Sequence, residues 1–252
     1  MAVIGAVSVA VSGAAGVDIR VSRISAVAAQ AQEHGTGWLS SSERARVAAI
    51  SSAARRTEFV AGRWQLRRLL AERHGGDAQR DWPLSAGRDE PPRLIDPPLS
   101  SACFFSLSHS GEWLACAVAD CAVGIDIEVT ARQKSFAAII DVIGTSNERA
   151  LFNRLDESEA RRYFWCLWTA KEACLKLHGD GANVPALQAI DTSVGAQTAS
   201  DHAWVWSGAP LTMALAMKGA PREGWCPRLD ALDDKITFPA AVAWPVAVVL
   251  PT

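Results

Sequence analysis

One run, CFFSLSHSGEWLACAVADCAVGIDIEV, constrains the fold of this chain more than any other stretch. Three segments of strand length, 103–108, 113–118 and 123–129, follow one another with only short turns between them. Short apolar or alternating segments bounded by Gly, Ser and Asp predict strands that pair with their chain neighbours. Strands joined so tightly favour a meander-like arrangement over a doubly wound parallel sheet.

Helices are expected in the chain both before and after these strands. The region 40–74 opens with serines suited to N-capping, has a glutamate in its first turn and stops before a Gly-Gly pair. Downstream, the pattern predicts a helical stretch over about 136–155 and a further helix over about 157–178. The segment 77–101 is rich in Pro, Asp and Ser and predicts a connecting loop with at most one short strand. This mixed order of elements predicts an α+β or α/β fold.

The composition narrows the class of function. Hydrophobic residues make up 49% of the 252 residues and charged residues 21%, which is typical of a globular protein that buries a sizeable core. The formal net charge of -2 argues against a general nucleic-acid surface and against a polybasic membrane anchor. We therefore expect neither a nucleic-acid partner nor a membrane partner.

Cysteine usage and hydropathy predict a soluble, cytoplasmic protein. The six cysteines form no CxxC and no paired Cys/His spacing, and several lie within apolar runs, as in a reducing compartment. No Lys or Arg precedes Arg20, so the positive region of a signal peptide is missing. The alternation of Val7, Val9 and Val11 predicts a first strand instead. No run reaches the roughly 18 to 20 apolar residues of a membrane span.

The segment VGIDIEV carries the first candidate for chemistry. Strand alternation places Asp126 and Glu128 on one face, opposite Ile125 and Ile127. A rise of ~3.3 Å per residue separates the two Cα atoms by about 6.5 Å, so both carboxylates can reach one ion. Hard oxygen donors on a rigid strand suit Mg²⁺, which takes its remaining ligands from water and substrate phosphates. A solvated acidic edge strand is the commoner explanation of an isolated DxE.

The segment FWCLWTAKEACLKLHGDG favours the metal site over the solvated edge strand. Trp165, Trp168, Glu172 and Lys176 step by three and four residues and share one stripe of a helix. A surface salt bridge would explain Glu172 and Lys176, but not two tryptophans in the same stripe. A third carboxylate beside a metal, with a lysine one turn further on, explains all four. Lys171 is expected to be a solvated neighbour of this site or to contact a phosphate. Trp204 and Trp206 are expected to be core or interface residues.

The turn SLSHSGEW is the third element. Ser108, His109 and Ser110 offer hydroxyls, turn amides and an imidazole, which together suit a phosphate. The Ser/His pair also fits a hydrolase nucleophile, but the chain has no GxSxG. The neighbouring acids favour the metal and phosphate interpretation.

Taken in the order SHS, GIDIE, WTAKEACLK, these motifs resemble the central motifs of the 4′-phosphopantetheinyl transferases, specifically the larger Sfp-type group. The motif-bearing likeness covers about 104–181. A weaker likeness extends to RRTEFVAGRWQLRRLL, which is similar to the basic helix of that family and holds its pattern at Arg56, Phe59 and Arg63.

The resemblance implies transfer of phosphopantetheine from coenzyme A to a serine of an apo acyl or peptidyl carrier protein, with release of 3′,5′-ADP. It implies Asp126, Glu128 and Glu172 as Mg²⁺ ligands, with Glu172 also the base for the carrier serine, directly or through water. Lys176 would stabilise the pyrophosphate oxygens.

For coenzyme A, the resemblance implies that Ser108 and His109 bind a phosphate. Arg56, together with Arg44 and Arg63, would supply positive charge near the 3′-phosphate. The implied fold is a pseudo-twofold duplication of two similar α/β lobes with the site between them. We place these lobes at 1–120 and 121–252, the second carrying the metal site, in a monomer.

The chain departs from the family pattern at a few positions. The connector reads GRDEPPRL where many relatives carry Gly-Lys-Pro, so Arg88 or Arg93 is the candidate substitute for that lysine. Ser106 takes the place of a common asparagine. The carrier protein is expected to dock on 136–155, and the motifs do not distinguish fatty acid, polyketide, peptide or siderophore carriers.

Two other functions fit the same motifs. One is a non-catalytic module of this fold that binds coenzyme A or a carrier protein. The other is a different Mg²⁺-dependent phosphoryl enzyme that acts on a nucleotide without a carrier protein.

Overall fold

The computed structural model describes residues 16–87, 90–95, 103–131, 135–179, 183–193, 201–218 and 242–248. Its strands and helices in chain order are β1 (Val17–Arg23), α1 (Ile24–Glu33), α2 (Ser41–Ala49), α3 (Ala53–His74), β2 (Phe104–Ser110), β3 (Trp113–Ala119), β4 (Val123–Val129), α4 (Phe136–Ile143), α5 (Ser146–Phe152), α6 (Glu157–His178), α7 (Val184–Gln188), β5 (Ile190–Asp191), β6 (Asp201–Ser207), β7 (Leu211–Lys218) and β8 (Val242–Val248).

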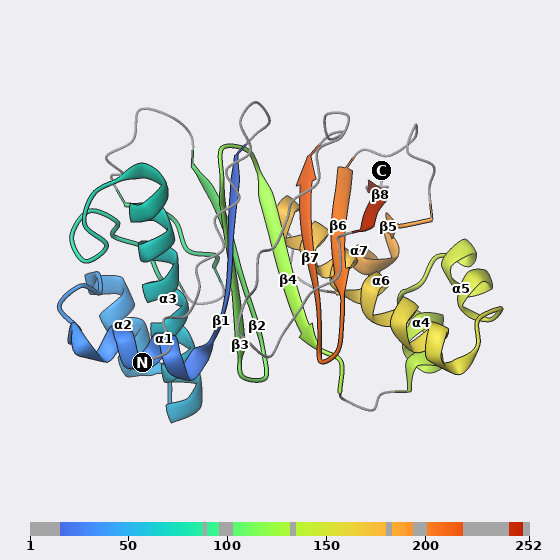
Figure 1. Ribbon diagram of the computed structural model, residues 1–252, viewed down its shortest axis with the longest axis horizontal. Helices are drawn as coiled ribbons and strands as arrows, with labels where there is room; N and C mark the ends of the chain where they lie inside the picture. Colours follow the sequence, from blue (N-terminus) through green and yellow to red (C-terminus); the bar gives the residue numbers. More distant parts are fainter. Residues whose placement is uncertain are drawn as a thin grey trace.

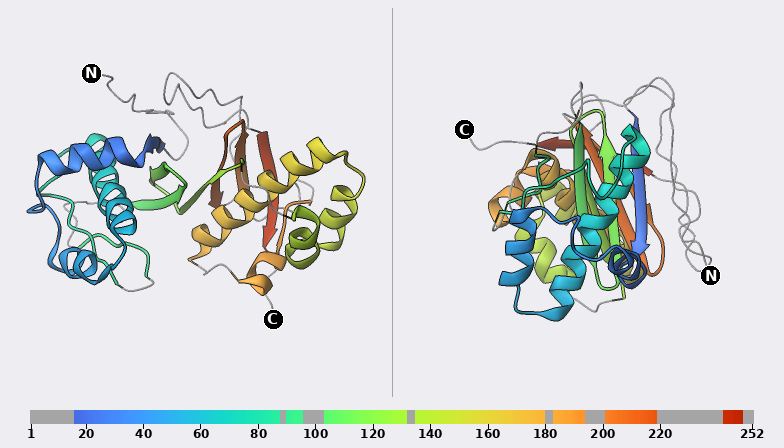
Figure 2. Two further views of the ribbon diagram at one scale, coloured as in Figure 1. Left: turned by 90° about the horizontal axis from the view of Figure 1, so that it is seen from below. Right: turned by 90° about the vertical axis from the view of Figure 1, so that its left-hand side faces the viewer.

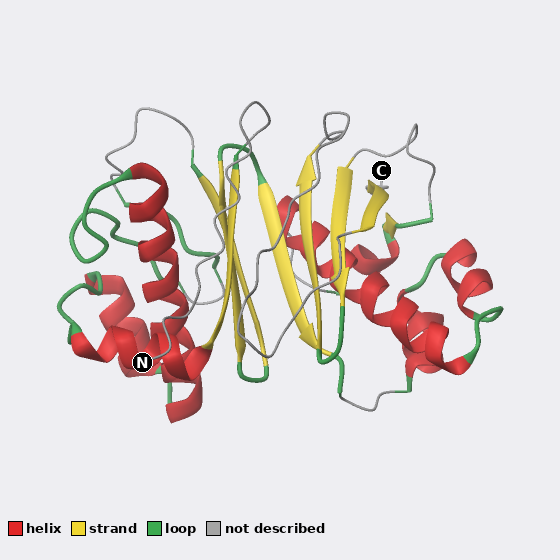
Figure 3. Ribbon diagram, viewed as in Figure 1, coloured by secondary structure: helices red, strands yellow, loops and turns green. Residues whose placement is uncertain are grey.

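The strands lie at the centre of the molecule and the helices flank them on both sides (Figures 1 and 3). They form a sheet of order β1-β3-β2 and a sheet of order β4-β7-β6-β8-β5. The paired strands run antiparallel throughout these two sheets. The predicted α+β class is therefore confirmed.

The two sheets share a hydrophobic core. Val17, Ile19 and Val21 of β1 belong to the same buried cluster as Ile125 and Ile127 of β4. Residues of β3, β6 and β7 complete this cluster, and they include Trp113, Trp204, Trp206, Leu211, Met213 and Leu215. The expectation that Trp204 and Trp206 are packing residues is confirmed.

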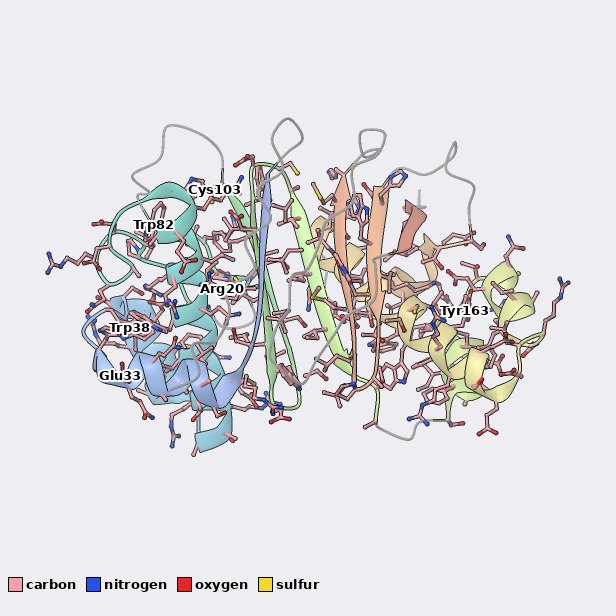
Figure 4. The ribbon with its side chains drawn as sticks, in the orientation of Figure 1. Arg20, Glu33, Trp38, Trp82, Cys103 and Tyr163 are labelled. Atoms are coloured by element: carbon pink, nitrogen blue, oxygen red, sulfur yellow. The ribbon has the colours of Figure 1, made fainter. Side chains whose placement is uncertain are left out.

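The opposite face of each sheet is covered by its own helices (Figure 2). Helix α3 packs Leu66, Leu69 and Leu70 against Cys116 and Val118 of β3. Helix α6 packs Ala170, Ala173 and Cys174 against alternate residues of β6 and β7, namely Ala203, Val205, Ala214 and Ala216. Figure 4 shows Trp38 and Trp82 within the first helical layer and Tyr163 in the second, at the other side of the molecule.

Helix boundaries follow from local capping. The stretch predicted as one helix over 136–155 is two helices, because Thr145 caps α5 and Gly144 ends α4. Likewise Ser40 and Ser52 cap α2 and α3, so the region 40–74 also contains a break. Helix α1 was not anticipated, since neither a side-chain cap nor a charged turn marks its ends.

The strands differ from expectation in two respects. Strand β2 continues through His109 and Ser110, and only Gly111 and Glu112 form the turn. Strand β4 does not pair with its chain neighbour β3 but with β7 of the other sheet. The connector 77–101 contributes an isolated bridge between Leu84 and Leu94 in its described part. The predicted strand around Val7–Val11 lies outside the described residues.

Both halves begin with a strand that is followed by helices, and both contain an antiparallel strand pair, β2–β3 or β6–β7, while the second half also has β5 and β8 (Figure 1). In each half, the helix before the long helix opens with a capping box that contains a fully buried glutamate, Glu43 or Glu148. Each glutamate pairs with a buried cation of the 22-residue helix, Arg67 of α3 or Lys171 of α6. Arg67 and Lys171 occupy the same position, 14 residues after the first residue of their helix.

Candidate active site

Helix α6 crosses β4 in direct contact at Gly124. A Cβ atom at Gly124 would lie 2.0 Å from the carbonyl oxygen of Ala173 and 2.6 Å from the amide nitrogen of Leu177. Real Cβ atoms do not approach other atoms so closely, so only glycine permits this crossing. The crossing brings Asp126 and Glu128, which share the face of Gly124, within reach of the side chains of α6.

Strand β2 lies beside β4 and holds it through serine side chains. Ser106 Oγ accepts a hydrogen bond from the Ile125 amide at 3.0 Å, and Ser110 Oγ accepts one from the Val129 amide at 3.1 Å. Ser108 Oγ lies 2.7 Å from Asp126 Oδ1 and donates a hydrogen bond to it. These bonds join the two sheets where no backbone ladder is formed between β2 and β4 in the described residues.

Asp126 is buried and paired with Lys176. Its Oδ1 lies 2.7 Å from the Lys176 ammonium, and its exposed fraction is 5%. Burial raises the pKa of Asp126, while the charge of Lys176 and the hydrogen bonds from Lys176 and Ser108 act in the opposite direction. Its Oδ2 is buried and has no hydrogen-bond partner among the described residues. An unsatisfied buried carboxylate oxygen fits a site that receives a cation.

Glu128 and Glu172 complete the set of predicted metal ligands. Glu128 accepts a hydrogen bond from Ser110 Oγ at 2.7 Å and one from Trp168 Nε1 at 3.0 Å. Glu172 is half-buried on α6, one turn from Trp168 and one turn from Lys176, both of which contact the carboxylates of β4. In the part of the chain that the structure describes, no three His, Cys, Asp or Glu side chains are gathered closely enough to hold a metal ion.

A cleft of about 1200 Å³ extends from β2 to the helices of the first half and reaches Glu128. Its lining includes Ser108 and His109 of β2, and Phe59 and Arg63 of α3. Arg46 and Arg55 add further positive charge to its wall. The cleft thus joins predicted phosphate-binding residues to a predicted metal ligand.

Arg63 is the most unusual cation of the cleft. It is 7% exposed, its Nε lies 3.8 Å from Glu43 Oε1, and its Cζ lies 4.8 Å from the centre of the Phe59 ring. Burial lowers the pKa of Arg63 to about 10, so the group stays charged at neutral pH. Glu43 already receives hydrogen bonds from Arg67 at 2.9 and 2.5 Å. The cluster therefore has an excess positive charge, and Arg63 Nη1 has no hydrogen-bond partner among the described residues.

Other predicted cations lie elsewhere. Arg44 donates to the Leu39 carbonyl and Arg56 donates to the carbonyls of Ile50 and Ser51, and neither lines the cleft. Arg93 is exposed and also lies outside the lining, whereas Arg88 falls outside the described residues. The lining residues Arg46 and Arg55 were missed, because the sequence shows many arginines in this region and no periodicity that distinguishes these two.

Comparison with known proteins finds similarity to the same family. A family model described as the 4′-phosphopantetheinyl transferase superfamily matches residues 122–215, from the start of β4 into β7. The resemblance to the 4′-phosphopantetheinyl transferases is confirmed. The matched segment contains Asp126, Glu128, Glu172 and Lys176.

Individual relatives carry the same description. The chain is 33% identical over 147 residues to the 4′-phosphopantetheinyl transferase HetI of Nostoc sp., a match that covers 57% of this chain and 60% of HetI. It is 35% identical over 81 residues to Sfp of Bacillus subtilis, covering 32% of this chain and 35% of Sfp. Against AcpT of Escherichia coli it is 32% identical over 80 residues, covering 31% and 41%. The chain therefore matches between a third and about three fifths of the length of these relatives.

The lysine before Glu172 has a different place from the one expected. Lys171 is fully buried, and its ammonium lies 2.8 Å from Glu148 Oε2. It also donates hydrogen bonds to three backbone carbonyls, those of Ile143, Leu187 and Ile190. Burial lowers the pKa of Lys171, and the adjacent Glu148 opposes that shift. The prediction of a solvated lysine is wrong, because the partner glutamate on α5 was not visible in the sequence.

In the described part of the chain, no helix is long and apolar enough to span a membrane.

Proposed function

We propose that this protein transfers the 4′-phosphopantetheine group of coenzyme A to a serine of an apo acyl or peptidyl carrier protein, in a Mg²⁺-dependent reaction that releases 3′,5′-ADP. One observation carries the proposal: the cleft joins Arg63, Ser108 and His109 to Glu128, beside the Asp126–Lys176 pair. Anion-binding groups thus lie near the carboxylates of Glu128 and Asp126, which supports a metal-assisted phosphoryl transfer.

Asp126, Glu128 and Glu172 would hold the metal. The buried Oδ2 of Asp126, which has no hydrogen-bond partner in the described part of the chain, supports this assignment. The position of Glu172 between two residues that contact β4 supports it as well. When bound, Mg²⁺ would neutralise charge on the pyrophosphate oxygens. Lys176 would then share its charge between Asp126 and the pyrophosphate.

In the transfer, the carrier serine oxygen forms a bond to the β-phosphorus of coenzyme A. The bond from that phosphorus to the bridging oxygen breaks, and 3′,5′-ADP leaves with that oxygen. The serine proton passes to Glu172, directly or through water. Lys176 stabilises the negative charge that develops on the departing phosphate.

Arg63, Ser108 and His109 would bind the phosphates of coenzyme A. Arg63 Nη1 has no hydrogen-bond partner in the segments that the structure describes, and this supports the role because a buried guanidinium donor favours an anionic acceptor. His109, which is exposed, lines the same cleft as the buried Arg63. Arg44 and Arg56 stay predictions for the 3′-phosphate region, and each would have to exchange a backbone carbonyl for the phosphate.

We also infer that the fold is a pseudo-twofold duplication, with lobes at 1–120 and 121–252 in a cytoplasmic monomer. The repeated element order, the matching sheet orders β1-β3-β2 and β4-β7-β6, and the matching buried ion pairs support it. The carrier protein would dock on 136–155. Half-exposed Val142 on α4 and Leu151 on α5 support an apolar contact there.

Intact-protein mass spectrometry tests the function. An apo carrier protein incubated with this enzyme, coenzyme A and Mg²⁺ should gain the mass of one phosphopantetheinyl group, and EDTA should abolish the gain. Glu172→Gln should lower turnover by orders of magnitude while coenzyme A still binds, and Asp126→Ala should weaken turnover and Mg²⁺ dependence together. Binding of coenzyme A without a mass gain on several carriers would instead indicate a non-catalytic module.

A further inference from the structure

The two oxygens of Glu128 are held from opposite sides. Ser110 Oγ, on β2 of the first sheet, donates to Oε2 at 2.7 Å. Trp168 Nε1, on α6, donates to Oε1 at 3.0 Å. Both distances are those of well-formed hydrogen bonds. The carboxylate therefore has its position fixed by two elements that do not belong to its own strand.

Ser110 is suited to this task because its own hydroxyl is oriented. Its oxygen accepts a hydrogen bond from the Val129 amide at 3.1 Å, which directs its proton toward Glu128. Ser110 is 6% exposed, so water competes little for that proton. Trp168 is half-buried, and its indole can donate only one hydrogen bond.

We propose that Ser110 and Trp168 are positioning residues, which hold the carboxylate of Glu128 in the orientation that binds the metal. We call the three residues the Glu128 clamp. The proposal rests on the proposed function, since it takes Glu128 as a metal ligand. Groups that orient a metal ligand through hydrogen bonds change metal affinity by roughly 10–100-fold when they are removed. The clamp also explains why a tryptophan stands in the stripe of Glu172 and Lys176.

The clamp links β4, which carries Glu128, to both halves of the molecule. Ser110 belongs to the first sheet and lines the cleft together with Ser108 and His109. Trp168 stands one turn before Glu172 on α6. Ser110 would thus fix the position of a coenzyme A phosphate bound in the cleft relative to a metal bound by β4.

The test is direct binding of Mn²⁺, followed by its electron paramagnetic resonance signal, with and without coenzyme A. Ser110→Ala and Trp168→Phe should each raise the Kd for Mn²⁺ by roughly tenfold or more, while Ser110→Thr, which keeps the hydroxyl, should retain tight binding. Turnover of the two weakened variants should recover in part as Mg²⁺ is raised, which a purely structural defect would not do.

Ser106→Ala is the matched control. Ser106 accepts a hydrogen bond from the Ile125 amide as Ser110 does from Val129, but no carboxylate contact of Ser106 is described. Both alanine variants lose one serine-to-backbone bond, and Ser110→Ala also loses the bond to Glu128, so its melting temperature should fall at least as far as that of Ser106→Ala. Of the two variants, only Ser110→Ala should lose Mn²⁺ affinity.

Glu128→Gln distinguishes a failure of the clamp from a failure of the assignment of Glu128 as a metal ligand. If Glu128→Gln weakens Mn²⁺ binding but Ser110→Ala and Trp168→Phe do not, the clamp is wrong and the metal assignment stands. If Glu128→Gln also binds Mn²⁺ as tightly as the unmodified protein, the metal assignment and the clamp both fall.

Discussion

At the scale of single residues, the site depends on buried charges whose partners are only partly supplied by the protein. Arg63 shares Glu43 with Arg67 and keeps one donor without a partner in the described residues. Asp126 keeps one unpartnered oxygen in the same way. Arg63 lines the cleft, and Asp126 lies two residues from the lining residue Glu128. Under the proposed function, each of the two groups would bind a ligand of opposite charge.

Arg63→Met should weaken coenzyme A binding by roughly 10- to 100-fold, because a charge-assisted hydrogen bond contributes about 1.5–3 kcal/mol. Isothermal titration calorimetry with coenzyme A measures this. Arg80→Met serves as the comparison, since Arg80 is exposed and does not line the cleft. Equal losses in both variants would show that general positive charge, rather than the buried Arg63, attracts the coenzyme.

Substitutions of the two lysines of α6 should have different effects, one on stability and the other on turnover. Lys171→Met leaves Glu148 buried without its ion-pair partner, and we expect a loss of about 3–5 kcal/mol in the free energy of unfolding. Lys176 is 29% exposed, so Lys176→Met should cost less stability and should instead lower turnover. Urea unfolding and the mass-gain assay distinguish them. A stable Lys171→Met variant with no activity would contradict the structural role.

At the scale of elements, the crossing of α6 over β4 determines the geometry of the site. Gly124→Ala would force apart two backbones that are in contact, because the nearest atoms are the Ala173 carbonyl and the Leu177 amide. We expect a loss of about 1–3 kcal/mol in unfolding free energy and a marked fall in turnover, as the residues of α6 move away from β4.

Gly62→Ala provides the stability control for this change. A Cβ at Gly62 would meet Leu107 at 3.5 Å and Leu114 at 3.7 Å, which are ordinary contacts, and alanine favours the helix. Its unfolding free energy should be unchanged or higher in urea denaturation. If Gly124→Ala is equally harmless, α6 does not rest on β4 as closely as described.

Many of the helices and strands could be predicted from the sequence. The strands around 103–129 and the helix over 157–178 were anticipated, because alternation, turn residues and caps are local signals. The pairing of β4 with β7 could not be predicted, since it joins residues about ninety positions apart that carry no shared pattern. For the same reason the Lys171–Glu148 pair was missed, whereas the stripe from Trp168 to Lys176 was visible as helical spacing.

At the scale of the whole molecule, the two sheets share one core, so the halves should not unfold separately. Trp206 is 1% exposed in that core, and Trp206→Ala should lower the unfolding free energy by about 3–5 kcal/mol. Far-ultraviolet circular dichroism and tryptophan fluorescence should report one coincident urea transition, for the variant as for the unmodified protein. Two separated transitions would show that each half is stable alone.

The matched long helices have one further consequence. Four residues before the buried cation, α3 carries Arg63 and α6 carries Leu167, which is fully buried in an apolar cluster. The second half therefore offers hydrocarbon where the first offers a guanidinium. Under the proposed pseudo-twofold duplication and the proposed function, we expect one coenzyme A molecule per chain, because Leu167 takes the place that Arg63 has in the first half.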